Sequence, residues 1–552
     1  MDSLSSNTVP AAARLLAAAL IWLCCCAGEL AAAGAVAVHA MVATDHELAS
    51  EAACDVLREG GTAMDAAVTA AYVLGVVNPQ SSGLGGGGFL VAYDAATGRT
   101  HALEYRDRAP SGTAELLASG RARPQLSGGL AASVPCEVVG LEAARKRFGR
   151  LPRARLLAPA IRLAREGFPT GRLLADMARA YSDQRSRGAE LDRLLIGPDG
   201  RSMVRGETFW QPELASTLER IAREGADAVM AGPVARAIAL AVNAHGGRMS
   251  QSDFDAMAAH WVEPLAARYR DCQIFAMPPP ASGAAVLMAL RLFEPTPART
   301  LGPYAPSRVA ALASAIHHGV RAKRRHLGDP AFGPIPLELF LSGANPSVDS
   351  GTTRDDEEPE EEGHTTNVCV VDAIGNAVAM TMSLGAPFGS HILVPGTGIV
   401  LSNHIADFSP RPFEPNAYGT RYGPGNTIAP LKAAVSGSTP MLVFRGGRLA
   451  LAIGGSGSSR IPPAVTQCLV NVVDHGIPPA QAVALPRFQV TGGSEKISVE
   501  PTFPAATRAA LRLLGHTVRE GVKRSSVTAI AVRPGLLLGA SDPRKFGVPV
   551  GY

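Results

Sequence analysis

Apolar and polar positions follow a helical spacing through the middle of the chain. Between residues 137 and 327, apolar residues recur three or four positions apart, which is typical of helices that bury one face. This spacing predicts helices over Glu137–Phe148, Ala154–Arg165, Pro212–Arg223, Val234–Asn243, Ala284–Phe293 and Ser307–Leu327. A strand near 266–276 interrupts the series. Helices on a few strands indicate that this part of the chain covers a sheet.

The pattern before residue 80 predicts a strand and two helices. A short strand starts at Ala35 and leads into a helix over Glu47–Arg58, which two glycines end. The next helix, about Ala63–Val77, is apolar on nearly every side and must therefore be buried.

Strands are predicted to return after residue 364. They lie at Gly398–Ser402, Pro440–Phe444, Leu449–Ile453 and Thr528–Val532, with helices near Pro462–Asp474 and Pro504–Leu514. The loops between these elements are rich in Ser, Gly and Asp. Binding groups usually lie on loops that a rigid scaffold holds, so these loops are candidates for a site.

Thr365 stands where a charged run meets an apolar hairpin. The acidic run from Arg354 to Glu362 has almost nothing apolar to bury, so we expect it to be solvated and unstructured. Two strands, Asn367–Val371 and Ala377–Ser383, follow it around a Gly-Asn turn. If the peptide bond before Thr365 were cut, the new α-amine would lie beside the threonine hydroxyl, and an amine can activate such a weak nucleophile. A linker that enters an edge strand is the alternative interpretation.

The composition is that of a globular chain, and it argues against a nucleic-acid-binding surface and against a metal site. The 552 residues, 47% of them hydrophobic, can fill two or more domains or one large α/β unit. The net charge of +4 is small and no basic run with aromatic residues occurs, so a nucleic-acid partner is not predicted. The 8 Cys form no C-x-x-C pair and have no His at metal-ligand spacing. We therefore expect neither a disulfide framework nor a metal, and no other cofactor.

The first residues of the chain indicate export. Residues 11–28 are apolar apart from one Arg, and a run of small residues follows them. This arrangement suits a signal peptide over residues 1–34 better than a membrane span. We therefore expect a secreted protein in an extracellular or periplasm-like compartment. An uncleaved anchor through 11–28, with the rest of the chain outside the membrane, is the alternative, because Cys24 to Cys26 could be acylated.

Two further motifs concern ligands. Gly83, Gly85 and Gly88 have the spacing of a dinucleotide-binding loop, but they follow a helix and lead into a strand, the reverse of the required order. A nucleotide site is therefore not predicted. Arg106 follows a strand and lies between an aromatic residue and an acid, where a fixed guanidinium can hold a carboxylate through two hydrogen bonds.

From about residue 36 to its last residue, the chain resembles the γ-glutamyltransferase family of N-terminal-nucleophile hydrolases. The motifs that carry the resemblance are NPQSSGLGGGGF (78–89), EYRDRAP (104–110), MPPPASG (277–283), LGDP (327–330), TTNVCVVDAIGNAVAMT (365–381), DFS (407–409) and GASDPR (539–544). The resemblance implies an α/β protein with a four-layer αββα sandwich, made as one precursor that cleaves itself before Thr365. It implies a large chain, 35–364, that ends in the acidic linker 350–364, and a small catalytic chain, 365–552. The two chains would stay associated.

The resemblance also assigns the groups that perform the chemistry. It places the nucleophile on Thr365 and a supporting hydroxyl on Ser383. Backbone N–H groups at Gly457 and Ser458 would form the oxyanion hole, where preorganised donors stabilise a tetrahedral intermediate.

A second set of residues would bind the substrate. Arg106 would hold the α-carboxylate of a γ-glutamyl group, Asp407 its α-amine, and Ser436 would add a hydrogen bond to the carboxylate. His404 and Gly437 occupy two more positions of the substrate pocket.

Several positions depart from the family pattern. Asn367 stands where His is usual, Gly385 replaces an Asn, and His404 replaces a Gln or Glu. Gly437 replaces the second Ser of a pair, and Ser458 the second glycine of the oxyanion loop. One lost hydrogen bond in such a site costs about 1–3 kcal/mol, and one lost oxyanion donor about 10²–10³ in rate.

The expected function is that of a γ-glutamyl transferase or hydrolase acting on glutathione and related compounds. Thr365 would form a γ-glutamyl ester, which water, an amino acid or a peptide then resolves. Two alternatives remain open at this point. One is an acylase of the same fold with a different acyl specificity, and the other is a non-catalytic homologue that serves as a binding or structural protein.

Overall fold

The computed structural model describes residues 34–183, 189–197, 199–297, 300–342, 364–490, 496–521 and 525–552. The apolar segment 11–28 and the acidic run 354–362 lie outside these residues, so the predictions made for them stay predictions. In the described part of the chain, no helix combines the length and the hydropathy that a membrane span requires.

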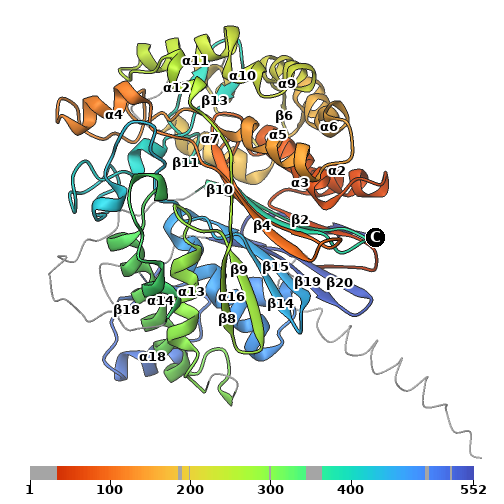
Figure 1. Cartoon of the computed structure of the whole chain (residues 1–552), viewed down its shortest axis with the longest axis vertical. Coiled ribbons are helices and arrows are strands. Elements are labelled where there is room, and N and C mark those ends of the chain that lie inside the picture. Colours follow the sequence, from red (N-terminus) through yellow and green to blue (C-terminus); the bar gives the residue numbers. More distant parts are fainter. Residues whose placement is uncertain are drawn as a thin grey trace, which may run out of the picture.

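Two seven-stranded sheets form the centre of the molecule (Figure 1). The strands of the first sheet, in spatial order, are β21 (Val550–Gly551), β2 (Met41–Thr44), β10 (His364–Val371), β11 (Ala377–Gly385), β3 (Gly87–Asp94), β4 (Arg99–Tyr105) and β7 (His260–Val262). Those of the second are β1 (Gly34–Ala37), β20 (Leu536–Ser541), β19 (Ser526–Arg533), β15 (Arg448–Ser456), β14 (Met441–Arg445), β9 (Cys272–Ala276) and β8 (Leu265–Tyr269). Neighbouring strands of both sheets are antiparallel.

A layer of apolar side chains lies between the two sheets. Successive residues of a strand point to opposite faces, so Cys369 and Val371 of β10 enter this layer, while Val368 and Val370 face the helices outside. From the neighbouring strands the layer also takes Phe89, Val91, Leu442, Ala452 and Ile530. β10 is therefore apolar on both faces, as a strand covered on both sides requires.

Helices cover the outer face of each sheet, which gives the four-layer αββα arrangement that was predicted (Figure 1). The first sheet is covered by α2 (Glu47–Arg58), α3 (Ala63–Val77), α5 (Glu137–Phe148), α6 (Arg153–Glu166) and α9 (Pro212–Glu224). The second is covered by α13 (Gly283–Phe293), α14 (Pro306–His326), α16 (Ile461–His475), α17 (Pro479–Ala484) and α18 (Ala505–Leu513). The prediction that α3 is buried is confirmed, since every one of its residues except Gly75 is buried.

Shorter elements connect these layers. The helices among them are α4 (Ser111–Ala118), α7 (Arg172–Ser182), α8 (Ala189–Leu195), α10 (Asp227–Met230), α11 (Gly232–Ala244), α12 (Gln251–Asp255), α15 (Leu337–Leu341) and the 3-10 turns η2 (Pro330–Phe332), η3 (His404–Asp407), η4 (Pro424–Asn426) and η5 (Ser458–Arg460). The strands are β5 (Phe168–Pro169), β6 (Thr208–Phe209), β12 (Leu393–Val394), β13 (Ile399–Val400), β16 (Phe488–Gln489), β17 (Ile497–Val499) and β18 (Val518–Glu520).

The single strand predicted from Ala35 is wrong, because two strands in different sheets occupy this stretch. β1 belongs to the second sheet and β2 to the first. Between them, the N–H groups of Val38, His39 and Ala40 all donate to the carbonyl oxygen of Tyr552, the last residue. The acceptor that turns the chain here comes from its other end, so the local pattern cannot predict the break.

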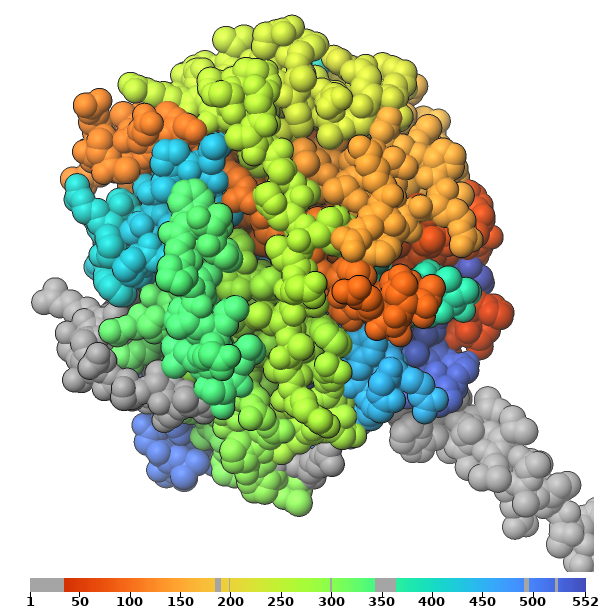
Figure 2. All heavy atoms as spheres, in the orientation of Figure 1, coloured from red at the N-terminus to blue at the C-terminus, as the bar shows by residue number. Residues whose placement is uncertain are grey.

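The parts of the chain before and after Thr365 share one sheet. β10 pairs with β2, and β11 pairs with β3, so the hairpin that Thr365 begins lies between two strands of the preceding part. The two parts of the chain also adjoin each other on the surface. In Figure 2, cyan and blue segments from after Thr365 lie against orange and green segments from before it. A cut before Thr365 would therefore leave both parts held by backbone hydrogen bonds and by the common core.

Candidate active site

Thr365 lies near the start of β10, opposite Ser383 of β11. Thr365 is buried, with 4% of its surface exposed, and its Oγ1 is 3.3 Å from Ser383 Oγ. The far end of the hairpin is held by Asp372, whose carboxylate accepts hydrogen bonds from the N–H groups of Ile374 and Asn376. The turn and the strand pairing together fix the position of the threonine hydroxyl.

Ser383 links the threonine hydroxyl to the peptide bond that precedes it. Ser383 Oγ donates to the carbonyl oxygen of His364 at 3.3 Å and accepts from the N–H of Gly385 at 2.9 Å. A hydroxyl has one proton to donate, and that of Ser383 is used on His364. The hydrogen bond between the two side chains is therefore donated by the Thr365 hydroxyl and accepted by Ser383 Oγ. The result is a continuous path from the Thr365 hydroxyl to the carbonyl oxygen of the bond before it.

Lys545 holds the main chain of Thr365 and was missed in the sequence. Its ammonium donates to the carbonyl oxygen of Thr365 and lies 3.6 Å from Asp45 Oδ2. The same carboxylate accepts from the N–H of Asn367 and the hydroxyl of Ser526. Burial lowers the pKa of Lys545, and Asp45 opposes this effect. The GASDPR motif ends one residue before Lys545, which is the signal that could have led to it.

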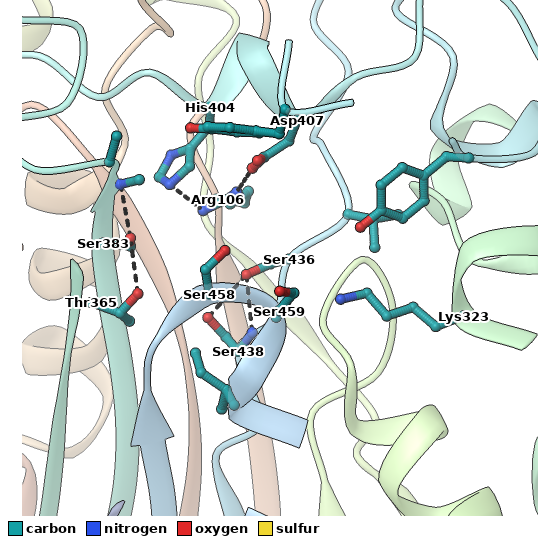
Figure 3. A pocket seen from close by; sticks show the side chains of 17 residues that line it. Arg106, Lys323, Thr365, Ser383, His404, Asp407, Ser436, Ser438, Ser458 and Ser459 are labelled. Carbon is teal, nitrogen blue, oxygen red and sulfur yellow. Dashed lines mark hydrogen bonds and ion pairs between the residues drawn. The ribbon is translucent and has the colours of Figure 1, made fainter. Parts of the chain in front are cut away.

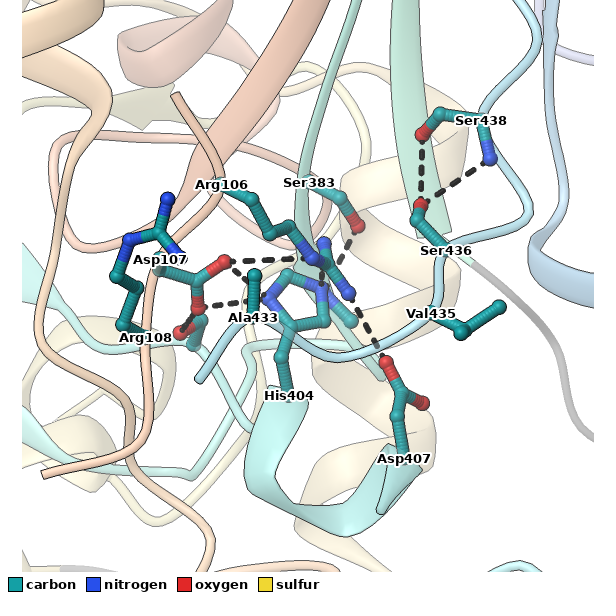
Figure 4. A network of polar contacts seen from close by, with 12 residues as sticks. Arg106, Asp107, Arg108, Ser383, His404, Asp407, Ala433, Val435, Ser436 and Ser438 are labelled. Carbon is teal, nitrogen blue, oxygen red and sulfur yellow. Dashed lines mark hydrogen bonds and ion pairs between the residues drawn. The ribbon is translucent and has the colours of Figure 1, made fainter. Parts of the chain in front are cut away.

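Arg106 is the centre of a second polar cluster (Figure 4). Its side chain, 2% exposed, follows β4 and reaches two groups of the turn η3. Nη2 lies 3.0 Å from Asp407 Oδ2, and Nη1 lies 3.0 Å from His404 Nε2. On its other side, His404 Nδ1 lies 2.8 Å from Asp107 Oδ2. The predicted carboxylate-binding arginine is thus held rigidly.

The partners of His404 fix its tautomer. A guanidinium has only donors, so Nε2 must accept from Arg106 through its lone pair. Nδ1 then carries the proton and donates to Asp107. In this arrangement the imidazole is neutral, and both of its nitrogens are occupied.

The two carboxylates around Arg106 have different electrostatic environments. Burial would raise the pKa of Asp107, but His404, Arg106 and the hydroxyl of Ser402 together hold it well below its usual range. Burial raises the pKa of Asp407 even though Arg106 lies next to it. Asp107 is therefore a permanent charge, whereas Asp407 lies in a place where a further cation would be favourable.

A neighbouring ionic network anchors the loop that carries Arg106. Arg108 donates to Glu104 Oε2 at 2.7 Å and to Asp329 Oδ2 at 2.9 Å. Asp329 in turn accepts from the N–H of Ala433, and Glu104 accepts from the N–H of Arg106. Burial raises the pKa of Glu104 to about 7, against the effect of Arg108. This network ties the Arg106 loop to the segment that leads to Ser436.

Ser436 lies on a tight loop together with Ser438, which the sequence did not indicate. Ser436 Oγ donates to Ser438 Oγ at 3.0 Å and accepts from the N–H of Ser438 at 3.1 Å. Ser282 also holds this loop, because its hydroxyl donates to the carbonyl oxygen of Ser436 at 2.5 Å. Two hydroxyls are therefore presented side by side opposite Arg106.

Gly457 and Ser458 follow β15 and begin the turn η5. Both have positive φ, +130° for Gly457 and +55° for Ser458, and the second value is unusual for a residue with a side chain. The N–H groups at the start of a helical turn have no partner within that turn. Ser458 and Ser459 line the same cavity as Thr365, so the start of this turn lies within reach of a bound ligand.

One cavity, with about 540 Å³ of space including its mouth, joins these groups (Figure 3). Of the predicted site residues, it is lined by Thr365, Ser383, Arg106, His404, Asp407, Ser436, Gly437 and Ser458. Gly457 is not among the lining residues, and Asn367 contacts Thr381 and Thr528 between the sheets. The cavity is also lined by Lys323, Tyr418, Tyr422, Ser438 and Ser459, which the sequence did not indicate.

A sequence model described as Gamma-glutamyltranspeptidase matches residues 49–552, which is most of the chain. The chain belongs to the γ-glutamyltranspeptidase family. Among its relatives are the glutathione hydrolase proenzymes of Escherichia coli strain K12, 33% identical over 91% of this chain and 90% of that protein, and of Pseudomonas aeruginosa, 35% identical over 92% and 93%. An acylase ACY 1 proenzyme of Pseudomonas sp. strain SE83 is 32% identical over 92% of this chain and 93% of that protein.

Solved structures confirm the fold. A cephalosporin acylase from Bacillus halodurans has a TM-score of 0.83 at 27% identity and covers 94% of this chain, with 97% of its own chain matched. The γ-glutamyltranspeptidase of Helicobacter pylori has a TM-score of 0.52 at 31% identity and covers 54% of this chain, with 87% of its own chain matched.

Close packing accounts for one departure from the family pattern, at Gly385. A Cβ atom at this position would lie 2.0 Å from Asn403 Oδ1. The Asn403 amide is itself fixed, because it accepts from the N–H of Ala386 and donates to the carbonyl of Leu126 and the hydroxyl of Tyr418. Asn403 thus occupies the space of the missing side chain, and no pattern in the sequence indicates this exchange.

Gly437 has a similar explanation and gives a testable prediction. A Cβ atom there would lie 2.1 Å from the carbonyl oxygen of Ser458, so the loop of Ser436 and the turn η5 are in backbone contact. We expect Gly437→Ser to lower kcat/KM several-fold and the unfolding temperature by a few degrees, since overpacking costs about 1–3 kcal/mol. Gly302→Ser is the matched control, because nothing lies within 4 Å of its Cβ position. A gain of activity in Gly437→Ser would contradict this account.

Proposed function

We propose that this protein cleaves glutathione and related γ-glutamyl compounds through an ester on Thr365, as a hydrolase and transferase. One observation carries the proposal: the hydroxyl of Thr365, the guanidinium of Arg106 and the first residues of η5 line the same cavity. Acyl transfer from a γ-glutamyl group needs a nucleophile, a group for the α-carboxylate and donors for the oxyanion, and each is supplied here.

The proposal includes a precursor that cuts itself between His364 and Thr365. Thr365 Oγ1 adds to the carbonyl carbon of His364, while its proton passes to Ser383 and the proton of Ser383 passes to the carbonyl oxygen. The C–N bond then breaks, the proton moves to the nitrogen, and His364 is left as an ester on Oγ1. Water hydrolyses this ester, which frees the α-amine of Thr365. The products are the chains 35–364 and 365–552.

Ser383 is expected to set the rate of this cut. Ser383→Ala removes the acceptor of the Thr365 proton and the donor to the His364 carbonyl, so the small chain should form about 10–100 times more slowly. Ser383→Thr keeps the hydroxyl and should be cut at nearly the normal rate. The measurement is the appearance of the small chain on a denaturing gel after cell-free synthesis. The control is Ser390→Ala, which removes a buried hydroxyl bonded to the Leu401 carbonyl. Normal cleavage of Ser383→Ala would refute the proposed proton path.

In the processed protein, Thr365 supplies both the base and the nucleophile. Its α-amine takes the hydroxyl proton, Oγ1 attacks the γ-carbonyl, and the tetrahedral oxyanion is stabilised by N–H groups at Gly457 and Ser458. The amide C–N bond breaks as the amine gives its proton to the leaving nitrogen. Water, or the amine of an amino acid or peptide, then attacks the ester and regenerates Thr365.

The head group of the substrate is held on the other side of the cavity. Arg106 holds the α-carboxylate as a planar donor, with the hydroxyl of Ser438 as an additional donor and that of Ser436 once it turns away from Ser438. Asp407 accepts the α-ammonium through the oxygen that Arg106 does not use.

We further propose that residues 1–34 export the protein, as a signal peptide that is removed or as an anchor with the catalytic part outside the membrane. The apolar residues 11–28 and the small residues after them support this. N-terminal sequencing of the large chain distinguishes the two cases.

An acylase of altered acyl specificity is the second candidate. It is favoured by one observation, the ion pair of Asp407 with Arg106, which leaves one oxygen of this carboxylate for an α-ammonium. The interpretation as a non-catalytic homologue loses much of its support, because Gly385 and Gly437 are explained by close packing rather than by loss of a site.

The test of the proposed function is the release of a chromogenic amine from a γ-glutamyl anilide. The purified protein should run as two bands, the smaller of about 19 kDa, and should release the amine with saturation kinetics. A single uncut band without amine release would overturn the proposal.

A further inference from the structure

We propose that a second cavity of this protein binds a small amphipathic carboxylic acid. The cavity lies at the turn of the β10–β11 hairpin, at the other end of β10 from Thr365. Arg147 and Arg150 bind the carboxylate, and the apolar tail lies on the floor of the cavity. No lining residue is shared with the catalytic cavity, so this site is independent of the proposed reaction.

The cavity lies where several elements meet. The start of α3, the end of α5, the strand β3 and the hairpin turn all contribute to its wall. In Figure 2 this turn is the small blue-green segment at the right, beside orange segments from the first part of the chain. The cavity holds about 340 Å³, and small-molecule sites usually hold about 300–1,000 Å³. Its size therefore suits a small ligand.

The distance to the nucleophile follows from the strand pairing. Val378 lines the cavity and pairs with Val370, five residues after Thr365 on the same strand. At about 3.3 Å per residue, the cavity and Thr365 are roughly 15 Å apart. A ligand bound here does not reach the catalytic groups.

The floor of the cavity is apolar. Met64, Ala92 and Val378 are buried members of the core cluster on the outer face of the first sheet, and the ring of Phe148 lies beside them. At the rim, the side chain of Ile374 is 65% exposed. A ligand with an apolar tail would cover this isoleucine and remove the floor from water, which is favourable.

The two arginines at the rim have no carboxylate partner in the described part of the chain. Arg147 Nη2 donates to His101 Nδ1 at 3.3 Å, and its guanidinium lies 4.4 Å from the centre of the Trp261 ring. Arg150 Nη1 donates to the carbonyl oxygen of Gly60 at 3.3 Å. A guanidinium carries five N–H groups, so both arginines are held in place and keep donors for a carboxylate.

Asp94 is the one acidic residue that lines the cavity, and its carboxylate is used in its own turn. It accepts from the N–H of Ala96 at 3.0 Å and from the hydroxyl of Thr97 at 2.7 Å. It makes no ion pair with the arginines of the rim. Its charge still lies on the same rim, so a head group with one negative charge fits better than one with two.

Two more carboxylates lie behind the wall, at the N-terminus of α3. Asp65 accepts from the N–H groups of Thr62 and Arg150, at 2.9 and 2.8 Å. Asp372 accepts from the N–H of Ala63 at 2.9 Å. The main-chain donors and the positive end of the helix dipole stabilise both charges where they are. Neither carboxylate lines the cavity, so neither occupies the place of the ligand.

The test uses three compounds that share one tail, octanoate, octanol and octylammonium. Each is titrated into the processed protein by isothermal titration calorimetry. We expect octanoate to bind with a Kd of about 0.1–1 mM, and the other two about tenfold more weakly. Octanoate should not compete with γ-glutamyl p-nitroanilide, because the two cavities are separate.

Variants of the arginines test the head group. Arg147→Gln and Arg150→Gln should each lower the affinity for octanoate about threefold, and the double variant about tenfold, with no change for octanol. Both side chains are exposed, so the variants should fold and release p-nitroaniline like the wild type. Arg236→Gln is the matched control, since it removes an exposed arginine of α11 that lines neither cavity.

A variant of the rim tests the place of the tail. Ile374→Asp removes apolar surface and adds a negative charge, so it should weaken octanoate about tenfold or more and octylammonium much less. Leu513→Asp changes another exposed side chain, 90% exposed in α18, and should bind octanoate like the wild type.

Each result decides the inference. Equal affinity for octanoate and octanol, or an unchanged affinity for octanoate in the double variant, would overturn it. Competition between octanoate and γ-glutamyl p-nitroanilide would place the acid in the catalytic cavity and overturn it as well. So would a dimer in size-exclusion chromatography that Ile374→Asp separates into monomers, because the cavity would then receive a second copy of the chain.

Discussion

Thr365→Ala is expected to remain a single uncut chain and to have an amidase activity at least about 10⁴-fold lower than the wild type. The reason is that one residue supplies the nucleophile for both the self-cleavage and the amidase reaction. Thr365→Ser keeps the hydroxyl and the α-amine, so it should still be cut and should retain part of the activity. The measurements are a denaturing gel and the release of p-nitroaniline from γ-glutamyl p-nitroanilide.

The next residue offers a close control for this prediction. Thr366 is also buried, but its side chain points to the opposite face of β10, and its hydroxyl has no hydrogen-bond partner among the described residues. Thr366→Ala should therefore be cut and should act like the wild type. If Thr365→Ala were cut normally, or if both variants lost activity equally, Thr365 would not be the nucleophile.

Arg106→Gln is expected to produce the second largest effect, a rise of KM for γ-glutamyl substrates by about 10²–10³ with a smaller change in kcat. The variant loses the fork that binds the carboxylate and leaves Asp407 buried without its partner, a loss of about 2–5 kcal/mol. Arg106→Lys should recover little, because an ammonium cannot bridge His404, Asp407 and a substrate carboxylate together.

The cleavage reaction separates this binding role from a structural one. Thr365, Ser383 and His364 make their hydrogen bonds without Arg106, so Arg106→Gln should still form two chains. Steady-state kinetics and the gel together check the prediction. An uncut variant would show that Arg106 holds the fold, and an unchanged KM would show that the carboxylate binds elsewhere.

The sequence predicted most of the regular elements because their signals are local. α5 begins and ends at the predicted residues, and the hairpin of β10 and β11 follows from its Gly-Asn turn. The predicted strand at Gly398–Ser402 shortens to β13, because Ser402 donates to Gly85 and Leu401 to Ile392, outside a regular ladder. The break between β1 and β2 depends on Tyr552, and no local pattern contains a contact with the far end of the chain.

Some residues of the site could likewise be predicted from the sequence, and others could be found only in the structure. Thr365 and Arg106 could be proposed from their chemistry and neighbours, and the family resemblance added Asp407, Ser436 and the oxyanion loop. The structure brings these residues to one cavity. Lys323, Asn403 and Lys545 were missed, because an ordinary lysine in a helix or an asparagine in a loop becomes informative only when its burial and its partners are known.

A covalent ester on Thr365 is the intermediate that the proposed mechanism requires. The processed protein is mixed briefly with γ-glutamyl p-nitroanilide, quenched in acid, and the small chain is digested and weighed by mass spectrometry. We predict a mass increase of one glutamyl group, located on the peptide that begins with Thr365 and removed by hydroxylamine, as expected for an ester. Turnover with no adduct on that peptide, or with the adduct on another residue, would contradict the assignment of Thr365 as the nucleophile.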